Sequence, residues 1–419
     1  PFFLYVAPGA NHSPHHAPKE WIDKFKGQFD AGWDVYRQQT FERQKKLGVV
    51  PPQAQLTKRP AELPAWDSLS ADQKRLFARM MEVYAAALSH ADHQIGRIVD
   101  AIDEMGKLEN TLVIYIMGDN GASAEGTPQG LLNEMAIMNN ISEDFSQVLA
   151  RIDELGSPMT YNHYPVGWAH AMDTPFQWTK QIASHFGGTR NPMAVRWPAR
   201  IKPDAAVRPQ FHHVNDIAPT IYDVVGITPP SVVNGIPQDP FDGTSLAYAF
   251  GDAKAKGRKH TQYFEIMGSR AIYNDGWMAS AFGPRTPWVP GLPPGIKEWT
   301  PDKDQWELYN LNGDWSQAND LAAKMPAKLE ELKQLFLIEA TRNKVLPIGG
   351  GLWIIALRPD LRITPPYKEW TFGCVCSGEY RRRIRAWEFR LVYSILEDCQ
   401  GFAFGVGNAY LAGRENRDA

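Results

Sequence analysis

Six apolar residues, Leu112 to Met117, run without interruption into the turn sequence Gly118-Asp119-Asn120-Gly121. Such unbroken, β-branched runs are typical of strands buried on both faces in the middle of a parallel sheet. A long helix is predicted just before this strand, from about residue 71 to 105. Its start is indicated by Ser70 and Gln73, which have capping-box spacing, and apolar residues then follow at helical intervals. A buried strand that follows a long helix predicts an α/β fold.

Later segments continue this alternation and then depart from it. Residues 192–198 resume the sheet, and a helix that starts near Asn215 ends at Gly226, before two prolines. Residues 127–170 have the character of an insertion that carries its own helix near residues 143–154. From about residue 257 short strands and turns dominate, followed by an amphipathic helix over residues 327–341. We therefore predict a main domain over residues 1–256 and a smaller α+β subdomain over residues 257–372.

The two ends of the chain carry separate expectations. Residues 1–6 already have the pattern of a buried strand, so we expect that a segment before Pro1 is missing. From Gly373 onward the chain holds all three cysteines and no lysine. That change predicts an atypical tail over residues 373–419, for which a shifted reading frame is one explanation and an ordinary divergent C-terminus is another.

The overall composition limits the kinds of partner. The chain is 43% hydrophobic and 22% charged, with a formal net charge of -3. It therefore lacks the excess of positive charge that would attract nucleic acid or an anionic membrane surface. No apolar run approaches the roughly 20 residues that cross a bilayer. We expect a soluble protein with a small-molecule substrate, while the compartment, cytoplasmic or periplasmic, and the oligomeric state stay open.

Five residues are candidates for a site. Asp119 and Asn120 follow the predicted strand, and a carboxylate beside an amide oxygen suits a hard cation such as Ca²⁺ or Mg²⁺, although the same sequence also forms plain turns. His12 follows the opening strand and could donate a hydrogen bond or a proton to an anionic oxygen, or could be a surface histidine. Lys180, shortly before a glycine pair, could hold an oxyanion or be a solvated charge, and Arg190 has the same two interpretations.

Taken in order, these segments resemble the sulfatase family, most closely the bacterial arylsulfatases, whose fold is that of the alkaline-phosphatase superfamily. The resemblance spans about residues 1–372. It is carried by a spaced series of motifs: Pro1 to Tyr5 leading into His12-Ser13-Pro14, Gly118 to Gly121, Thr174-Pro175-Phe176 with Lys180, Gly187 to Arg190, Asp216 to Thr220, and Trp306 to Leu311 with Asp320-Leu321.

The resemblance implies a mixed sheet flanked by helices, with a smaller C-terminal α+β subdomain. It also implies roles at matching positions. Asp119 and Asn120 would be metal ligands, His12 would contact the sulfate or its leaving group, and Lys180 would bind the sulfate. The family's nucleophile is a formylglycine made within a Cys/Ser-x-Pro-x-Arg motif, which this sequence does not contain. We therefore expect the formylglycine in the missing N-terminal segment, and a chain that is inactive alone.

Two other functions are compatible with the same residues. A phosphodiesterase or phosphonate hydrolase of the same superfamily needs similar oxyanion contacts. A non-catalytic protein could keep the sheet and a weak cation site for binding or scaffolding. The leading interpretation remains a sulfuric ester hydrolase of the arylsulfatase type that acts on a small-molecule sulfate ester.

Overall fold

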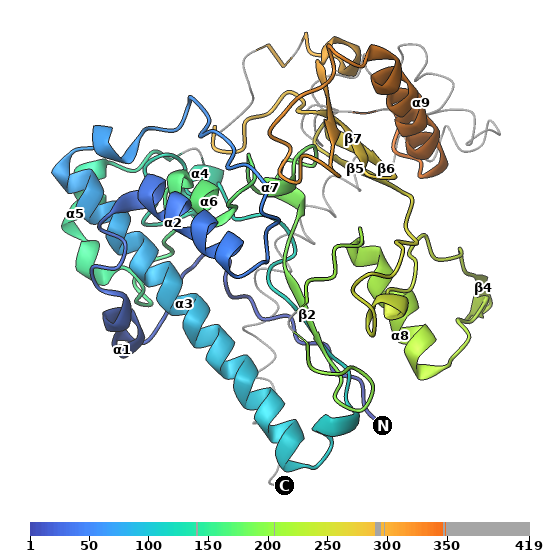
Figure 1. The fold of residues 1–419 in the computed structure, drawn as a ribbon. Helices are drawn as coiled ribbons and strands as arrows, with labels where there is room; N and C mark the ends of the chain where they lie inside the picture. Colours follow the sequence, from blue (N-terminus) through green and yellow to red (C-terminus); the bar gives the residue numbers. More distant parts are fainter. Residues whose placement is uncertain (140, 205, 290–294, 297, 347, 349–419) are drawn as a thin grey trace, which may run out of the picture. The chain divides into compact units, whose positions relative to one another are not determined.

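The computed structural model describes residues 1–139, 141–204, 206–289, 295, 296, 298–346 and 348. All of them fall in the first of two compact units, residues 1–357 and 358–419. The predicted tail over residues 373–419 lies outside the described residues. Figure 1 labels most of the elements, whose bounds are α1 Lys19–Ile22, α2 Gly32–Lys46, α3 Ala71–Glu104, β1 Val113–Ile116, α4 Met135–Met138, α5 Phe145–Ala150, α6 Val166–Met172, α7 Phe186–Thr189, β2 Met193–Arg196, α8 Ile217–Val225, β3 Val232–Val233, β4 Ile236–Pro237, β5 Thr261–Ile266, β6 Ser269–Asn274, β7 Trp277–Ala281, β8 Trp306–Asn310 and α9 Pro326–Arg342.

Helix α3 begins where its capping box predicts. The Ser70 hydroxyl accepts a hydrogen bond from the Gln73 amide at 3.2 Å, and the Ser70 amide donates to Gln73 Oε1 at 2.9 Å. These two bonds satisfy donors that the first turn would otherwise leave unpaired. The helix ends at Glu104, one residue from the predicted end. The predicted helix is therefore confirmed.

Aromatic side chains fill the core between α2, α3 and α6. Trp33 from α2 and Trp168 from α6 pack edge to face, with ring centroids 5.8 Å apart. Trp168 is fully buried, and its indole N–H donates to the carbonyl of Phe77 on α3 at 2.9 Å. A buried indole with its N–H satisfied contributes both apolar area and a fixed orientation. This core holds the loops that lead to the candidate site.

The strand at residues 112–117 forms, but its predicted surroundings were wrong. Strand β1 pairs antiparallel with β2, with Val113 opposite Arg196 and Ile116 opposite Met193. Its residues are half-buried or exposed. An apolar run predicts a strand that tends to be buried, but it does not predict whether the neighbouring strand is parallel or antiparallel. That direction is set by the long connection between the two strands.

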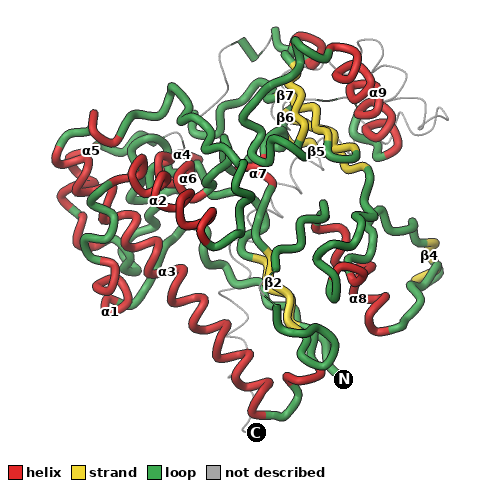
Figure 2. The backbone as a smooth tube through the Cα atoms, viewed as in Figure 1, coloured by secondary structure: helices red, strands yellow, loops and turns green. Residues whose placement is uncertain are grey.

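The predicted strand at residues 1–6 is also wrong. Within the described part of the chain this segment has no strand partner, and it is drawn as loop in Figure 2. Phe3 and Tyr5 are 75% and 81% exposed. A strand needs a neighbour to satisfy its backbone N–H and C=O groups, and a local apolar pattern cannot supply one.

A four-stranded antiparallel sheet, in the order β5-β6-β7-β8, follows in the second half of the chain. Helix α9 packs on it through a buried cluster that includes Ile272, Leu308, Leu332 and Phe336. The helix spans residues 326–342, so the helix predicted over residues 327–341 is confirmed. The domain boundary after residue 256 remains a prediction. None of the described helices combines the length and the apolar character needed to cross a bilayer.

Candidate functional site

His12 and Lys180, which are far apart in the sequence, meet at one carboxylate. The Nε2 atom of His12 lies 3.0 Å from Oε2 of Glu125, and the Lys180 ammonium donates to the same oxygen at 2.8 Å. The distance between Lys180 Nζ and His12 Nε2 is 3.0 Å. We call these three residues the anion cluster. It brings together the two residues that the sequence nominated as contacts for an oxyanion.

The loop after β1 positions Glu125 next to Lys180 through backbone hydrogen bonds. The Lys180 amide donates to the Ala122 carbonyl at 3.1 Å, and the Gly121 amide donates to the Gly188 carbonyl at 3.0 Å. A Cβ atom on Gly121 would collide with the carbonyl oxygen of Gly187, so this close approach requires glycine. The turn after β1 is therefore fixed against the segment that carries Lys180.

Outer hydrogen bonds hold the other side of the cluster. The His12 ring places Nδ1 at 3.2 Å from the Ser13 carbonyl, and the Ser13 hydroxyl donates to the Asn162 carbonyl at 2.9 Å. His163 is fully buried, with Nε2 at 2.9 Å from the Ser123 hydroxyl. Ser123 in turn lies 2.9 Å from Glu125 Oε2. Histidine rings held on both nitrogens have fixed orientations.

Donor and acceptor counting gives His12 two states. Its Nδ1 faces a carbonyl and must carry a proton. When Nε2 is unprotonated, it accepts from the Lys180 ammonium. When Nε2 is protonated, it donates to Glu125 instead. Protonation therefore moves the hydrogen bond of His12 from a cation to an anion.

The charges shift the acid–base behaviour of the cluster. The hydrogen bond to Glu125 raises the pKa of His12 above its usual value, against burial and the Lys180 charge, which lower it. Burial alone would raise the pKa of Glu125, but hydrogen bonds from His12 and Lys180 outweigh burial and lower it. Burial lowers the pKa of His163 to about 4, so this ring is neutral at physiological pH. The hydrogen bond between His12 and Glu125 thus favours the charged form of both side chains.

We predict that Glu125→Gln lowers the pKa of His12, because the variant removes the largest cause that raises it while the Lys180 charge remains. The imidazolium of His12 would then be lost at a lower pH than in the native chain. A pH titration of the labelled histidine ring by NMR measures this directly. An unchanged midpoint would show that Glu125 does not control His12, and Glu154→Gln, which removes an exposed carboxylate elsewhere, serves as the control.

Asp119 and Asn120 stand apart from the anion cluster. Asp119 is exposed and Asn120 half-buried, and the Asn120 amide donates to Asp119 Oδ1 at 3.0 Å. In the described part of the chain neither side chain hydrogen-bonds to His12 or Lys180. The hollow that all four residues line is very large, with a lining that extends from Pro1 to Asn343. The fold therefore joins His12 to Lys180 directly, and no described contact links the acid–amide pair to them.

Two groups of side chains could be considered for a metal ion. His12, Glu125 and Glu134 place one ligand atom each within 4.8 Å of one another. The Lys180 ammonium already binds Glu125 there, so a divalent ion would face a fixed positive charge. Asp119 and Asn120 present oxygen ligands that no described lysine or arginine occupies, but Ca²⁺ takes six to eight such ligands. The pair therefore offers two oxygen atoms that suit a hard cation, and such a cation would need further ligands.

Arg190 is held away from the anion cluster. Its guanidinium lies 3.9 Å from the ring centroid of Trp315 and also stacks near Phe186. Burial lowers its pKa to about 10, which leaves it charged at neutral pH. The contact with aromatic faces indicates a packing role for this residue.

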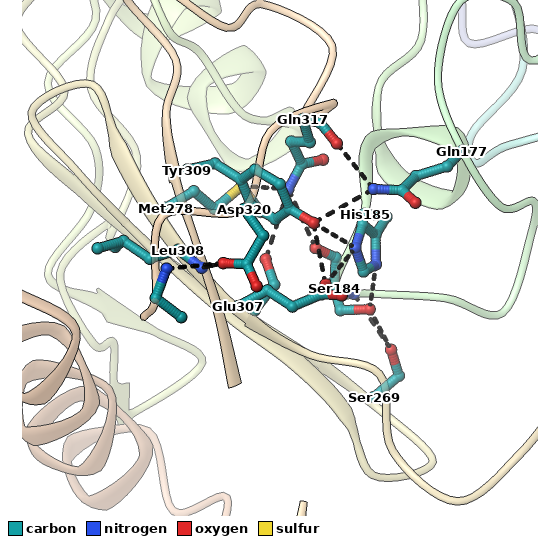
Figure 3. A network of polar contacts seen from close by, with 12 residues as sticks. Gln177, Ser184, His185, Ser269, Met278, Glu307, Leu308, Tyr309, Gln317 and Asp320 are labelled. Carbon is teal, nitrogen blue, oxygen red and sulfur yellow. Dashed lines mark hydrogen bonds and ion pairs between the residues drawn. The ribbon is translucent and has the colours of Figure 1, made fainter. Parts of the chain in front are cut away.

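A buried polar network fixes the segment between Lys180 and α7 (Figure 3). The Phe186 amide donates to Gln317 Oε1 at 2.8 Å, and the Gln177 side chain donates to the Gln317 carbonyl at 2.8 Å. His185 bridges Ser184, at 2.7 Å, and Glu307 on β8, at 2.9 Å. Ser184 and His185 are both buried, so this serine–histidine–glutamate arrangement has no access for a substrate. It ties the loop that carries Lys180 to the antiparallel sheet.

The sequence analysis missed four residues of the site. Glu125 and Ser123 lie just after the Gly118 to Gly121 turn, so their position beside a candidate loop was a usable signal. His163 and Glu134 come from the segment taken as an insertion, and no local pattern marks them. Glu134 Oε2 lies 3.8 Å from His12 Nδ1, and burial raises its pKa.

Known proteins resemble this chain in both sequence and structure. A profile of the Sulfatase family matches residues 1–227. An uncharacterized sulfatase of Schizosaccharomyces pombe is 31% identical over 357 residues, which is 82% of this chain and 58% of the relative. An arylsulfatase of Klebsiella aerogenes is 31% identical over 265 residues, which is 62% of this chain and 53% of the relative. The crystal structure of Ps i-CgsB gives a TM-score of 0.48 at 17% identity, over 89% of this chain and 56% of that chain.

The chain thus spans a little more than half the length of these two curated relatives. The family match covers the three loops that form the anion cluster and the β1–β2 pair. It agrees with the predicted α/β fold class of the alkaline-phosphatase type.

Proposed function

The chain belongs to the sulfatase family, and from this membership we propose that it supplies the anion-binding part of an arylsulfatase-type sulfuric ester hydrolase. One observation carries the proposal. A lysine ammonium and a histidine nitrogen converge on a single carboxylate oxygen at 2.8 and 3.0 Å. An oxygen of a sulfate group has similar charge and hydrogen-bonding needs, so the same donors suit it.

His12 and Lys180 have different roles in this proposal. The Lys180 ammonium carries a fixed positive charge, and it stabilises negative charge that grows on the sulfate oxygens as the ester bond breaks. His12, when protonated at Nε2, can give that proton to the leaving oxygen. The hydrogen bond to Ser13 keeps the ring oriented while it does so.

Asp119 and Asn120 would hold a divalent cation, Ca²⁺ or Mg²⁺, together with ligands that the described residues do not provide. Such an ion, when bound, polarises the sulfate oxygens. The support for this assignment is the pair of oxygen ligands in the turn that follows β1. The assignment of Asp119 and Asn120 as ligands does not depend on the compartment or on the oligomeric state.

We further propose that the chain as printed does not turn over. Its 419 residues include no Cys/Ser-x-Pro-x-Arg sequence, the motif that resemblance to the family associates with the formylglycine nucleophile. Without a nucleophile, the bond to sulfur is not attacked in the covalent manner of such enzymes. Binding without turnover is therefore the expected behaviour.

A calorimetric titration of the purified chain with phenyl sulfate tests this function. We expect saturable binding of phenyl sulfate, no binding of uncharged phenol, and hydrolysis of an aryl sulfate at the rate of buffer alone. Absence of saturable binding would contradict the proposed function. Hydrolysis at an enzyme-like rate would contradict the proposed lack of turnover.

A further inference from the structure

Glu125 places a negative charge at the centre of the proposed anion site. Its Oε2 atom is shared by His12, Lys180 and Ser123, and the Gln181 amide donates to Oε1 at 2.8 Å. Four side chains therefore hold the carboxylate in one position. A group bound this firmly stays in place when a ligand arrives.

An incoming anion meets the carboxylate together with the two positive groups. The side chains of Glu125 and Lys180 are 22% and 19% exposed, and His12 is 48% exposed. Ser123 and Gln181 line the same hollow, while His163 behind them is buried and neutral. The other acid near His12, Glu134, is almost fully buried. Glu125 is thus the carboxylate that a ligand at His12 and Lys180 approaches most closely.

The charge of the sulfate group changes during ester hydrolysis. The reaction converts R–OSO₃⁻ and water into R–OH, SO₄²⁻ and H⁺, so the ester carries one negative charge and the released sulfate carries two. Coulomb energy scales with the product of the charges. A fixed carboxylate therefore repels the product about twice as strongly, in free energy, as the substrate.

We infer that Glu125 is a specificity-determining residue that weakens binding of the dianionic sulfate ion more than binding of a monoanionic sulfate ester. This inference rests on the proposed function, because it assumes that His12 and Lys180 bind the sulfate group. Its consequence for the reaction is weaker retention of the product. The carboxylate also keeps His12 and Lys180 in place, so one residue combines positioning with selectivity.

The test compares phenyl sulfate with inorganic sulfate on the full 419-residue chain. Both ligands are titrated at equal ionic strength, and NMR of the labelled His12 ring confirms that the ring is protonated in each protein at the pH used. Glu125→Gln should bind phenyl sulfate about fivefold more tightly and sulfate about 25-fold more tightly, because the second gain is the square of the first. Glu154→Gln removes the same charge at an exposed ion pair with Arg151 and should change neither affinity.

A charge-preserving variant separates electrostatics from packing. Glu125→Asp keeps the carboxylate and should keep the native ratio of the two affinities, and far-UV circular dichroism confirms that each variant is folded. Equal gains for both ligands in Glu125→Gln, or a ratio in Glu125→Asp that matches Glu125→Gln, would overturn the inference while leaving the anion site intact. If neither ligand binds the native chain or any variant, the proposed function itself fails.

Discussion

Replacing Arg37 with methionine is expected to lower the free energy of unfolding by about 4 kcal/mol, since each buried acceptor left without a donor costs about 1–3 kcal/mol. Arg37 lies on α2 and is only 4% exposed. Its guanidinium donates at 2.6 to 3.3 Å to oxygens on two separate segments, namely that of Thr57 and those of His170, Thr174, Pro175 and Phe176. Methionine fills a similar volume but donates none of these bonds.

Urea denaturation followed by circular dichroism measures the change. Arg43→Met, on an exposed position of the same helix, is the matched control and should change stability by less than about 0.5 kcal/mol. Arg37→Lys should lie between the two, because an ammonium cannot reach oxygens in several directions as a planar guanidinium does. If Arg37→Met unfolds at the same urea concentration as the native chain, the hydrogen bonds from Arg37 to these oxygens do not contribute to the free energy of unfolding.

Arg37 also links stability to the site. It fixes the backbone at Pro175 and Phe176, and the segment that begins there carries Lys180. Burial lowers the pKa of Arg37 to about 10, so the group stays charged at physiological pH. A buried cation with carbonyl partners thus sets the start of the loop whose far end is tied to Gln317 (Figure 3).

Local chemistry made parts of this fold predictable. The capping box at Ser70 and Gln73 gave the start of α3, and Gly226, with a φ of 69°, ends α8 as predicted. Such signals depend on neighbours in sequence and are therefore visible in it. The partner of β1 depends on a connection through residues 117–192, and no local pattern encodes the direction in which that connection returns.

Some residues of the candidate site could likewise be predicted from the sequence, and others could not. His12 and Lys180 were nominated from their motifs, and the structure brings them within 3.0 Å of each other. Glu125, which joins them, was missed although it follows the Gly118 to Gly121 turn, because a single glutamate in a loop has no distinguishing spacing. His163 was missed because it reaches the site only through the packing of the segment over residues 127–170. The chemistry of individual residues could be predicted from the sequence, whereas the contacts between them could be seen only in the folded structure.

Lys180→Met should weaken binding of phenyl sulfate by about thirtyfold, since a hydrogen bond to a charged group contributes about 2 kcal/mol. The loss has two causes. The variant removes the fixed positive charge, and it leaves Glu125 with one cationic neighbour fewer, so more of its negative charge repels the ligand. Lys333→Met, at an exposed ion pair on α9, removes the same charge elsewhere and should leave the affinity unchanged.

The central claim is that His12 and Lys180 together bind the sulfate group of an ester. Its most direct test is a phenyl sulfate titration of the native chain and of Lys180→Met, observed at the labelled His12 ring by NMR. We predict a saturable shift of the His12 signals in the native chain and about thirtyfold weaker binding in the variant. A His12 signal that does not respond to phenyl sulfate, or an equal response in both proteins, would contradict the claim.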